Sequence, residues 1–247
     1  MSMPVTAPVV PYLSSRLQAL YQWVAAAQAG AVRHRYDEVW DCCCDHGYLG
    51  THILANKLCS QVHFVDQVAH LIEGLRPRLK EYPADRYQTL IADASELRFV
   101  AERRHLIIIA GVGGEHSIDI VRAIVANHPQ QTLDFMFCPT TTQFDLREYL
   151  AESAFELLHE SLVSDKNREY EVICARSNVQ DTPKQTVSNT GRHWDLSIAA
   201  HRRYLTKLIT HYQRCTLGTQ AAEAQRILVA YQATWECAAV AQNRSAL

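Results

Sequence analysis

An apolar run closes on a carboxylate in the stretch Val39-Trp40-Asp41-Cys42-Cys43-Cys44-Asp45-His46-Gly47-Tyr48-Leu49. The same arrangement occurs twice more before residue 95, in Val62-His63-Phe64-Val65-Asp66 and in Leu90-Ile91-Ala92-Asp93-Ala94. Because parallel strands place their carboxyl ends at one edge of a sheet, we expect these aspartates to gather there. Acidic groups gathered at such an edge are typical of a pocket that holds a nucleoside cofactor.

Strand and helix patterns alternate along most of the chain. The most β-branched segment, residues 106–110, predicts a buried central strand, and its glycine-rich exit leads into a helix. Two strands joined by a charged turn close the series, so the order predicts an α/β fold with a doubly wound sheet and an antiparallel end. The expected strands are residues 38–43, 61–66, 88–92, 106–110, 132–138, 157–163 and 170–175, and the expected helices are 13–27, 48–58, 69–81, 144–153 and one that ends at 124.

The composition favours a soluble protein with a substantial core. The chain has 247 residues, of which 48% are hydrophobic, enough for one large domain and a smaller one. No apolar run approaches the roughly 18 residues of a membrane span, and the N-terminus lacks a signal-peptide pattern. The eight cysteines form no CxxC pair, and four of them (Cys42, Cys43, Cys138 and Cys174) lie in or beside expected core strands. We therefore expect a cytoplasmic location without a membrane partner.

The C-terminal part of the chain has a different pattern. Residues 179–191 are polar and predict a linker between a domain of residues 1–178 and a helical unit of residues 192–247. Beyond the linker, apolar residues step by three and four in two runs, 198–215 and 224–238. Two heptad-spaced helices joined by a short turn predict an antiparallel α-helical coiled-coil hairpin.

Charge is divided unevenly between these parts, although the net charge is only -2. Residues 182–247 contain 8 Lys and Arg against 3 Asp and Glu, so the tail is basic and the rest of the chain is acidic. A basic tail on an acidic body indicates a polyanionic partner, and a merely solvated surface is an equally strong interpretation of so small an asymmetry.

The stretch from Asp41 to Leu49 resembles the first cofactor loop of S-adenosylmethionine-dependent methyltransferases, in the Asp-x-Gly-Ser-Asp-His-Ala-Tyr-Leu form of the TrmK-type tRNA (adenine-N1)-methyltransferases. A coiled-coil C-terminal domain is also a trait of that family. The resemblance implies a Rossmann-like class I methyltransferase that uses S-adenosylmethionine and methylates N1 of an adenine in tRNA. Further segments are similar to the family in order: Leu13-Ser14-Ser15-Arg16-Leu17 to its first helix, Val112-Gly113-Gly114 to its Gly-Met-Gly-Gly turn, Cys138-Pro139-Thr140 to its Gln-Pro-Asn, and Glu169-Tyr170-Glu171-Val172-Ile173 to its Tyr-Glu-Ile strand.

The resemblance implies a role for each strand end. Asp41 and Asp45 would take the methionine ammonium of the cofactor, and Asp66 would accept both ribose hydroxyls. Each aspartate taken alone is also a reasonable helix N-cap. The other implied cofactor contacts are Asp93 and Ala94 at the adenine, together with Cys43, Ala110, Gly111 and Val112. The implied catalytic residues are Tyr48 and Thr140, which would border the target base, and Asp45 or His46, which would assist loss of the amino proton. The implied RNA contacts are Arg202, Arg203, Lys207 and Arg214.

The chain departs from that family at two positions. Cys43 stands where the family has glycine, so the cofactor has to approach a side chain. Thr140 stands where the family has asparagine, which removes an amide able to offer both a donor and an acceptor to a base edge.

Other interpretations remain open. His46 and His52 lie near Cys42 and Cys44, but no second ligand pair has the spacing of a zinc site, so we expect no metal. The turn at 111–114 follows the fourth expected strand rather than the first, which disfavours a dinucleotide such as NAD. A methyltransferase of a small molecule or protein, and a cofactor-binding protein without transferase activity, are the alternatives to a tRNA enzyme. We expect a monomer or a homodimer.

Overall fold

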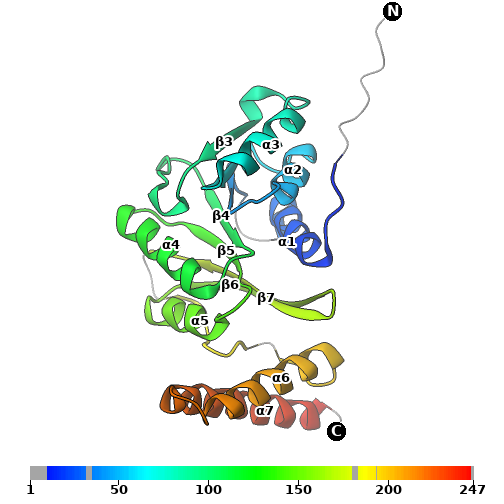
Figure 1. The fold of residues 1–247 in the computed structure, drawn as a ribbon, viewed down its shortest axis with the longest axis vertical. Helices are drawn as coiled ribbons and strands as arrows, with labels where there is room; N and C mark the ends of the chain where they lie inside the picture. The colour runs from blue at the N-terminus through cyan, green and yellow to red at the C-terminus, as the bar shows by residue number, and fades with distance from the viewer. Residues whose placement is uncertain (1–9, 32–34, 180–182, 193, 246–247) are drawn as a thin grey trace, which may run out of the picture.

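The computed structural model describes residues 10–31, 35–179, 183–192 and 194–245, the side chains of 31 and 241–245 excepted. Its centre is a seven-stranded sheet in the order β3-β2-β1-β4-β5-β7-β6 (Figure 1). The first five strands in this order are parallel, whereas β7 runs antiparallel to both β5 and β6. The strands are β1 (Glu38–Cys42), β2 (Gln61–Asp66), β3 (Tyr87–Ile91), β4 (His105–Ala110), β5 (Asp134–Cys138), β6 (Glu156–Asp165) and β7 (Arg168–Arg176).

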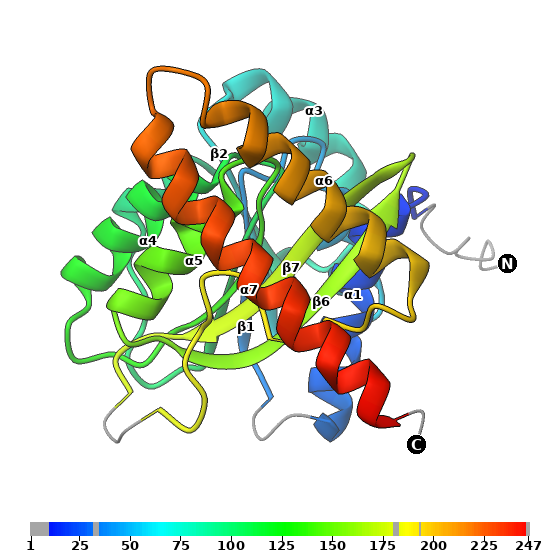
Figure 2. The ribbon, with the colours of Figure 1, turned by 90° about the horizontal axis from the view of Figure 1, so that it is seen from below.

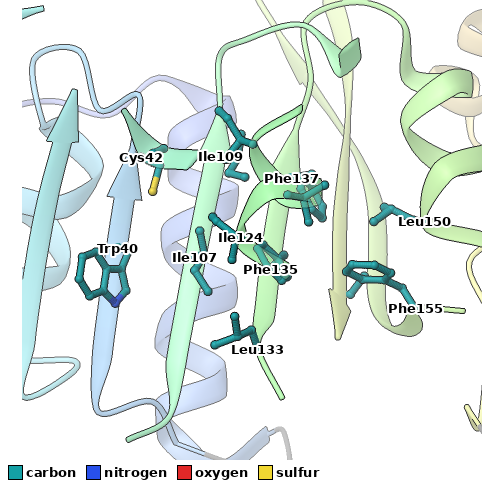
Figure 3. Packing of buried hydrophobic residues seen from close by; sticks show 14 of the residues in the cluster. Trp40, Cys42, Ile107, Ile109, Ile124, Leu133, Phe135, Phe137, Leu150 and Phe155 are labelled. Carbon is teal, nitrogen blue, oxygen red and sulfur yellow. The ribbon is translucent and has the colours of Figure 1, made fainter. Parts of the chain in front are cut away.

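Helices cover both faces of the sheet because the central strands carry apolar side chains on both faces. One face packs against α4 (Gly114–Asn127) and α5 (Gln143–Glu152), through a cluster that contains Ile107 and Phe135 (Figure 3). The other face packs against α1 (Ser15–Ala26), α2 (Tyr48–Ala55) and α3 (Ala69–Leu79). The strand order reverses between β1 and β4, which lead to helices on opposite faces. Such a switch point opens a crevice at the carboxyl ends of the strands.

The C-terminal helices α6 (Ala199–Cys215) and α7 (Ala221–Ser245) pack side by side across one end of the sheet (Figure 2). Their shared core includes Leu205 and Tyr231 and reaches Phe144 at the start of α5. The segment that precedes α6 follows the surface of the body, because Leu157 N donates to Gln185 O at 2.6 Å. The two helices are therefore packed against the N-terminal end of α5 and against β6.

The alternating order and the antiparallel end predicted from the sequence are confirmed, and so is the pair of C-terminal helices. The helix after β1 ends at Ala55 rather than at residue 58, because Lys57 adopts a left-handed conformation with φ of 53°. The coiled-coil geometry and the division into residues 1–178 and 192–247 stay predictions. Residues 1–9, 32–34, 193 and 246–247 of those units, and 180–182 of the linker, lie outside the described residues. None of the described helices has the length and apolar character needed to cross a bilayer.

Candidate active site

Three aspartates lie at the carboxyl ends of neighbouring strands, and we call Asp41, Asp66 and Asp93 the acidic half of the site. The Asp66 carboxylate accepts one hydrogen bond from Asp45 N and another from Val68 N, each at 3.0 Å. Asp66 therefore ties the loop after β1 to the end of β2, and each oxygen keeps a lone pair for a ligand hydroxyl. The Asp93 carboxylate accepts from Ser95 N at 2.8 Å, which lowers its pKa and makes it the cap of a short 3-10 turn.

Asp41 is the buried member of this group. Its Oδ2 accepts a hydrogen bond from Gly50 N at 2.9 Å, in the first turn of α2. Burial raises its pKa to about 7, and the nearby charge of Asp66 adds to the shift. A side chain at Gly50 would meet Phe64 at 2.4 Å and Asp41 Oδ2 at 2.9 Å, so only glycine allows α2 to approach so closely. A carboxylate held in this way gains from a cation placed beside it.

The loop between β1 and α2 requires unusual backbone conformations. Cys43 has φ of 55°, Asp45 has φ of 50° and Gly47 has φ of 65°, all in the left-handed region that favours glycine. The Cys43 thiol lies among the three carboxylates, and burial raises its pKa to about 11, with Asp66, Asp41 and Asp93 adding to the shift. This thiol is thus neutral and occupies space in the acidic half.

His46 and Tyr48 lie together on the outer side of this loop. Their rings stack with centroids 5.5 Å apart, and the Arg78 guanidinium of α3 lies 5.4 Å from the Tyr48 ring centroid. Asp45 and His46 are 3.6 Å apart and both are exposed. In the part of the chain that the structure describes, no three His, Cys, Asp or Glu side chains are grouped as ligands for a metal ion.

The loops after β4 and β5 lock together on the other side of the crevice. Thr140 N donates to Val112 O at 2.8 Å, and Gly114 N donates to Thr141 O at 2.9 Å. A side chain at Gly114 would lie 2.2 Å from Thr142 O, which explains the glycine there. Of the implied contacts, Ala110, Gly111 and Val112 therefore lie beside Thr140, whereas Tyr48 lies with the acidic half.

Three residues beside Thr140 were not identified from the sequence: Arg16, Arg168 and Tyr170, which we call the arginine–tyrosine cluster. The last pair between β5 and β7 joins Phe137 to Ile173, so the start of β7 continues past the end of β5. Arg168 there donates to Thr140 O. The two guanidinium carbons lie 5.1 Å (Arg16) and 5.3 Å (Arg168) from the Tyr170 ring centroid. No local pattern could have predicted this cluster, because α1 and β7 are far apart in the sequence.

The four arginine and lysine residues assigned to RNA lie on α6 and are all exposed. Arg202 donates to Leu196 O at 2.7 Å, and Arg203 pairs with Glu169 of β7 at 3.3 Å. Among the described residues, no ion pair involves Lys207 or Arg214. Lys207 and Arg214 are therefore the better candidates for phosphate contacts, and Arg203 also fastens α6 to the sheet.

A reversed strand order, an antiparallel end and carboxylates at successive strand ends define a Rossmann-like fold of the class I methyltransferase type. Residues 13–173 match the family described as "Methyltransferase domain", which is more than half of the chain, and the protein belongs to that family.

Solved structures share this fold over nearly the whole chain. The B. subtilis m1A22 tRNA methyltransferase TrmK is 18% identical, with a TM-score of 0.66, and the match covers 94% of this chain and 99% of that one. The M. capricolum TrmK in complex with S-adenosyl-homocysteine is 13% identical, with a TM-score of 0.66, over 90% and 97% of the two chains. Streptococcus pneumoniae Sp1610 in complex with S-adenosyl-L-methionine is 14% identical, with a TM-score of 0.68, over 90% and 98%. No curated protein matches the sequence.

Proposed function

We propose that this methyltransferase transfers the methyl group of S-adenosylmethionine to N1 of an adenine in tRNA. The observation that supports this most is the extent of the structural likeness, since 94% of this chain is covered by the match to the B. subtilis TrmK. That extent includes the C-terminal helices, which a methyltransferase domain of residues 13–173 alone does not contain. The basic tail of residues 182–247 also suits a tRNA substrate, because its positive charges can bind phosphates. A tRNA substrate would also fit a cytoplasmic location.

The residues of the acidic half fit S-adenosylmethionine, which supplies an electrophilic methyl group. Asp66 has free lone pairs for two ribose hydroxyls, and Asp93 with Ala94 lies one strand further along for the adenine. Asp41, buried and with a raised pKa, suits the positive charge of the methionine end. The Cys43 side chain takes up room among Asp41, Asp66 and Asp93, so it is the residue of the acidic half that is least suited to the cofactor.

Catalysis by this chain consists mainly of holding two reactants in line. N1 of adenine carries its own lone pair, so the protein has to present that nitrogen to the methyl group and keep the base in place. The paired edge of the base must be exposed first, by unpairing or flipping. Thr140 at the end of β5 offers a hydroxyl to the base, and the exposed Asp45 and His46 offer acceptors for the amino proton.

Incubation of the protein with radiolabelled S-adenosylmethionine and total tRNA, followed by nucleoside analysis, tests the proposal. The expected product is 1-methyladenosine, at a level that falls when Asp66 is replaced by Ala. Label in a protein or small-molecule fraction but not in tRNA would favour a different substrate. Cofactor binding without methyl transfer to any fraction would favour a cofactor-binding protein that is not a methyltransferase. The strained Cys43, at the position where the family has glycine, would agree with that result.

A further inference from the structure

The arginine–tyrosine cluster combines positive charge with a lack of carboxylate partners. Among the described residues, none of the ion pairs involves Arg16 or Arg168. The Arg16 guanidinium instead lies 3.7 Å from where a side chain at Gly111 would begin, and Arg168 donates to Thr140 O. Two guanidinium groups without carboxylate partners therefore lie beside Thr140, which is proposed to border the target base.

The rest of the molecule holds this cluster in place. Side chains alternate along β7, so Arg168 and Tyr170 take one face, and Glu169 and Glu171 take the other. Glu171 is fully buried and is bonded to Arg147 of α5 and to Tyr204 of α6, the latter at 2.7 Å. Because the opposite face of the strand is fixed in this way, the cluster is preorganised before a ligand arrives.

We propose that the arginine–tyrosine cluster binds the phosphodiester backbone of the RNA strand that carries the target adenine. The inference rests on the proposed function and extends it to a contact within the methyltransferase domain. Guanidinium groups match phosphate oxygens through paired N–H donors, and contact with an aromatic ring restricts their motion. A base taken out of its stack has to be held by its own strand, so phosphate contacts beside Thr140 are where the geometry requires them.

The test compares tRNA binding and methyl transfer for the full-length protein and three variants. The double variant Arg16→Gln with Arg168→Gln removes both charges, Tyr170→Leu removes the ring, and Arg122→Gln is the control. Arg122 on α4 also lies over a tyrosine, 5.2 Å from the Tyr149 ring centroid, but it is on another surface of the protein. Binding of total tRNA by the protein saturated with S-adenosylhomocysteine is measured at several salt concentrations.

The double variant is expected to bind tRNA about tenfold more weakly and to flatten the slope of log affinity against log salt by about 0.7 to 0.9 for each lost contact. Tyr170→Leu should weaken binding less, Arg122→Gln should change nothing, and cofactor affinity should stay the same in all three. Unchanged tRNA affinity and slope in the double variant would overturn the inference, as would a loss of cofactor affinity, which would assign Arg16 to the cofactor carboxylate. The proposed function fails separately, if the unaltered protein transfers no methyl group to tRNA.

Discussion

The carboxyl ends of β1, β2 and β3 carry aspartates supplied by the strands themselves, whereas the edge beside β4 and β5 is completed by arginines supplied by α1 and β7. The acidic half is held together by its own loops, since Asp66 accepts hydrogen bonds from Asp45 N in the loop after β1 and from Val68 N in the loop after β2. The arginine–tyrosine cluster depends on a network on the other face of β7 that joins α5, β6 and α6, in which Arg147 pairs with Glu160 at 2.8 Å and with Glu171, and Tyr204 donates to Glu171. The candidate cofactor site is thus built from three consecutive strand ends, whereas the proposed RNA contact joins α1 to β7 and also involves α5 and α6.

The largest effect should come from breaking that network. Arg147→Met leaves Glu171 buried without the cation that it pairs with, and such a loss costs about 3 to 5 kcal/mol of the free energy of unfolding. Arg226→Gln is the matched control, because Arg226 also pairs with two carboxylates, Glu148 and Glu223, but is 46% exposed. The control should cost less than about 1 kcal/mol. Urea denaturation measures the free energy of unfolding of both variants. Equal losses would show that the network behind β7 does not hold the arginine–tyrosine cluster in place.

The second effect tests the acidic half. Asp66→Ala removes the acceptor for two ribose hydroxyls and also releases Asp45 N and Val68 N, so cofactor binding should weaken by roughly 1.5 to 3 kcal/mol, or about ten- to a hundredfold. Asp93→Ala should weaken it less, because Asp93 would accept a hydrogen bond from the adenine amino group alone, whereas Asp66 would accept two. Calorimetric titration measures both constants. An unchanged cofactor affinity in Asp66→Ala would show that Asp66 does not bind the ribose of the cofactor.

The same contrast explains what the sequence could predict. Asp41, Asp66 and Asp93 each close an apolar run, and parallel pairing brings such positions to one edge, so the pattern of single strands was sufficient. Arg16 and Tyr170 meet only because β7 is inserted next to β5, and no periodicity encodes that contact.

The sequence also could not show which partners the charged residues of α5, α6 and β7 find. Glu171 and Arg147 are charged residues in amphipathic patterns, yet they are buried because each satisfies the other. The sequence pattern predicts a phosphate ligand at Arg203, whereas the fold pairs its guanidinium with Glu169. Residue type and spacing predict which groups are polar, but their partners are set by tertiary packing.

A third prediction uses the raised pKa of Asp41, about 7, which burial causes. A cationic cofactor favours the ionised carboxylate, so cofactor affinity should rise about tenfold between pH 6 and pH 8 relative to Asp41→Asn. The asparagine keeps an acceptor for Gly50 N, and the cofactor affinity of Asp41→Asn should lack this pH dependence.

The pH dependence of folding stability has the opposite sign. Because the pKa of Asp41 lies above the ordinary value of 3.8, this residue contributes stability below about pH 4 that is lost as the pH rises through 7. If the cofactor affinities of the unaltered protein and of Asp41→Asn changed with pH in parallel, Asp41 would not be the group that binds the positive charge of the cofactor.

The smallest effect concerns Cys43, where the local construction of the acidic half conflicts with its use. A residue other than glycine in the left-handed region costs roughly 1 kcal/mol, and the φ of Cys43 is 55°. Cys43→Gly removes this strain and also removes the thiol from among the three carboxylates. We expect both the free energy of unfolding and the cofactor affinity to increase, the latter several-fold.

Lys57→Gly separates the two causes, because Lys57 has a similar φ of 53° but lies at the end of α2, away from the three strand ends. It should gain stability by a comparable amount without any change in cofactor affinity. If Cys43→Gly gained stability alone, the thiol would be a neutral neighbour of the cofactor rather than an obstacle. If it lost affinity, the thiol would itself contact the cofactor, and the acidic half would bind its ligand through an uncharged group as well as through carboxylates.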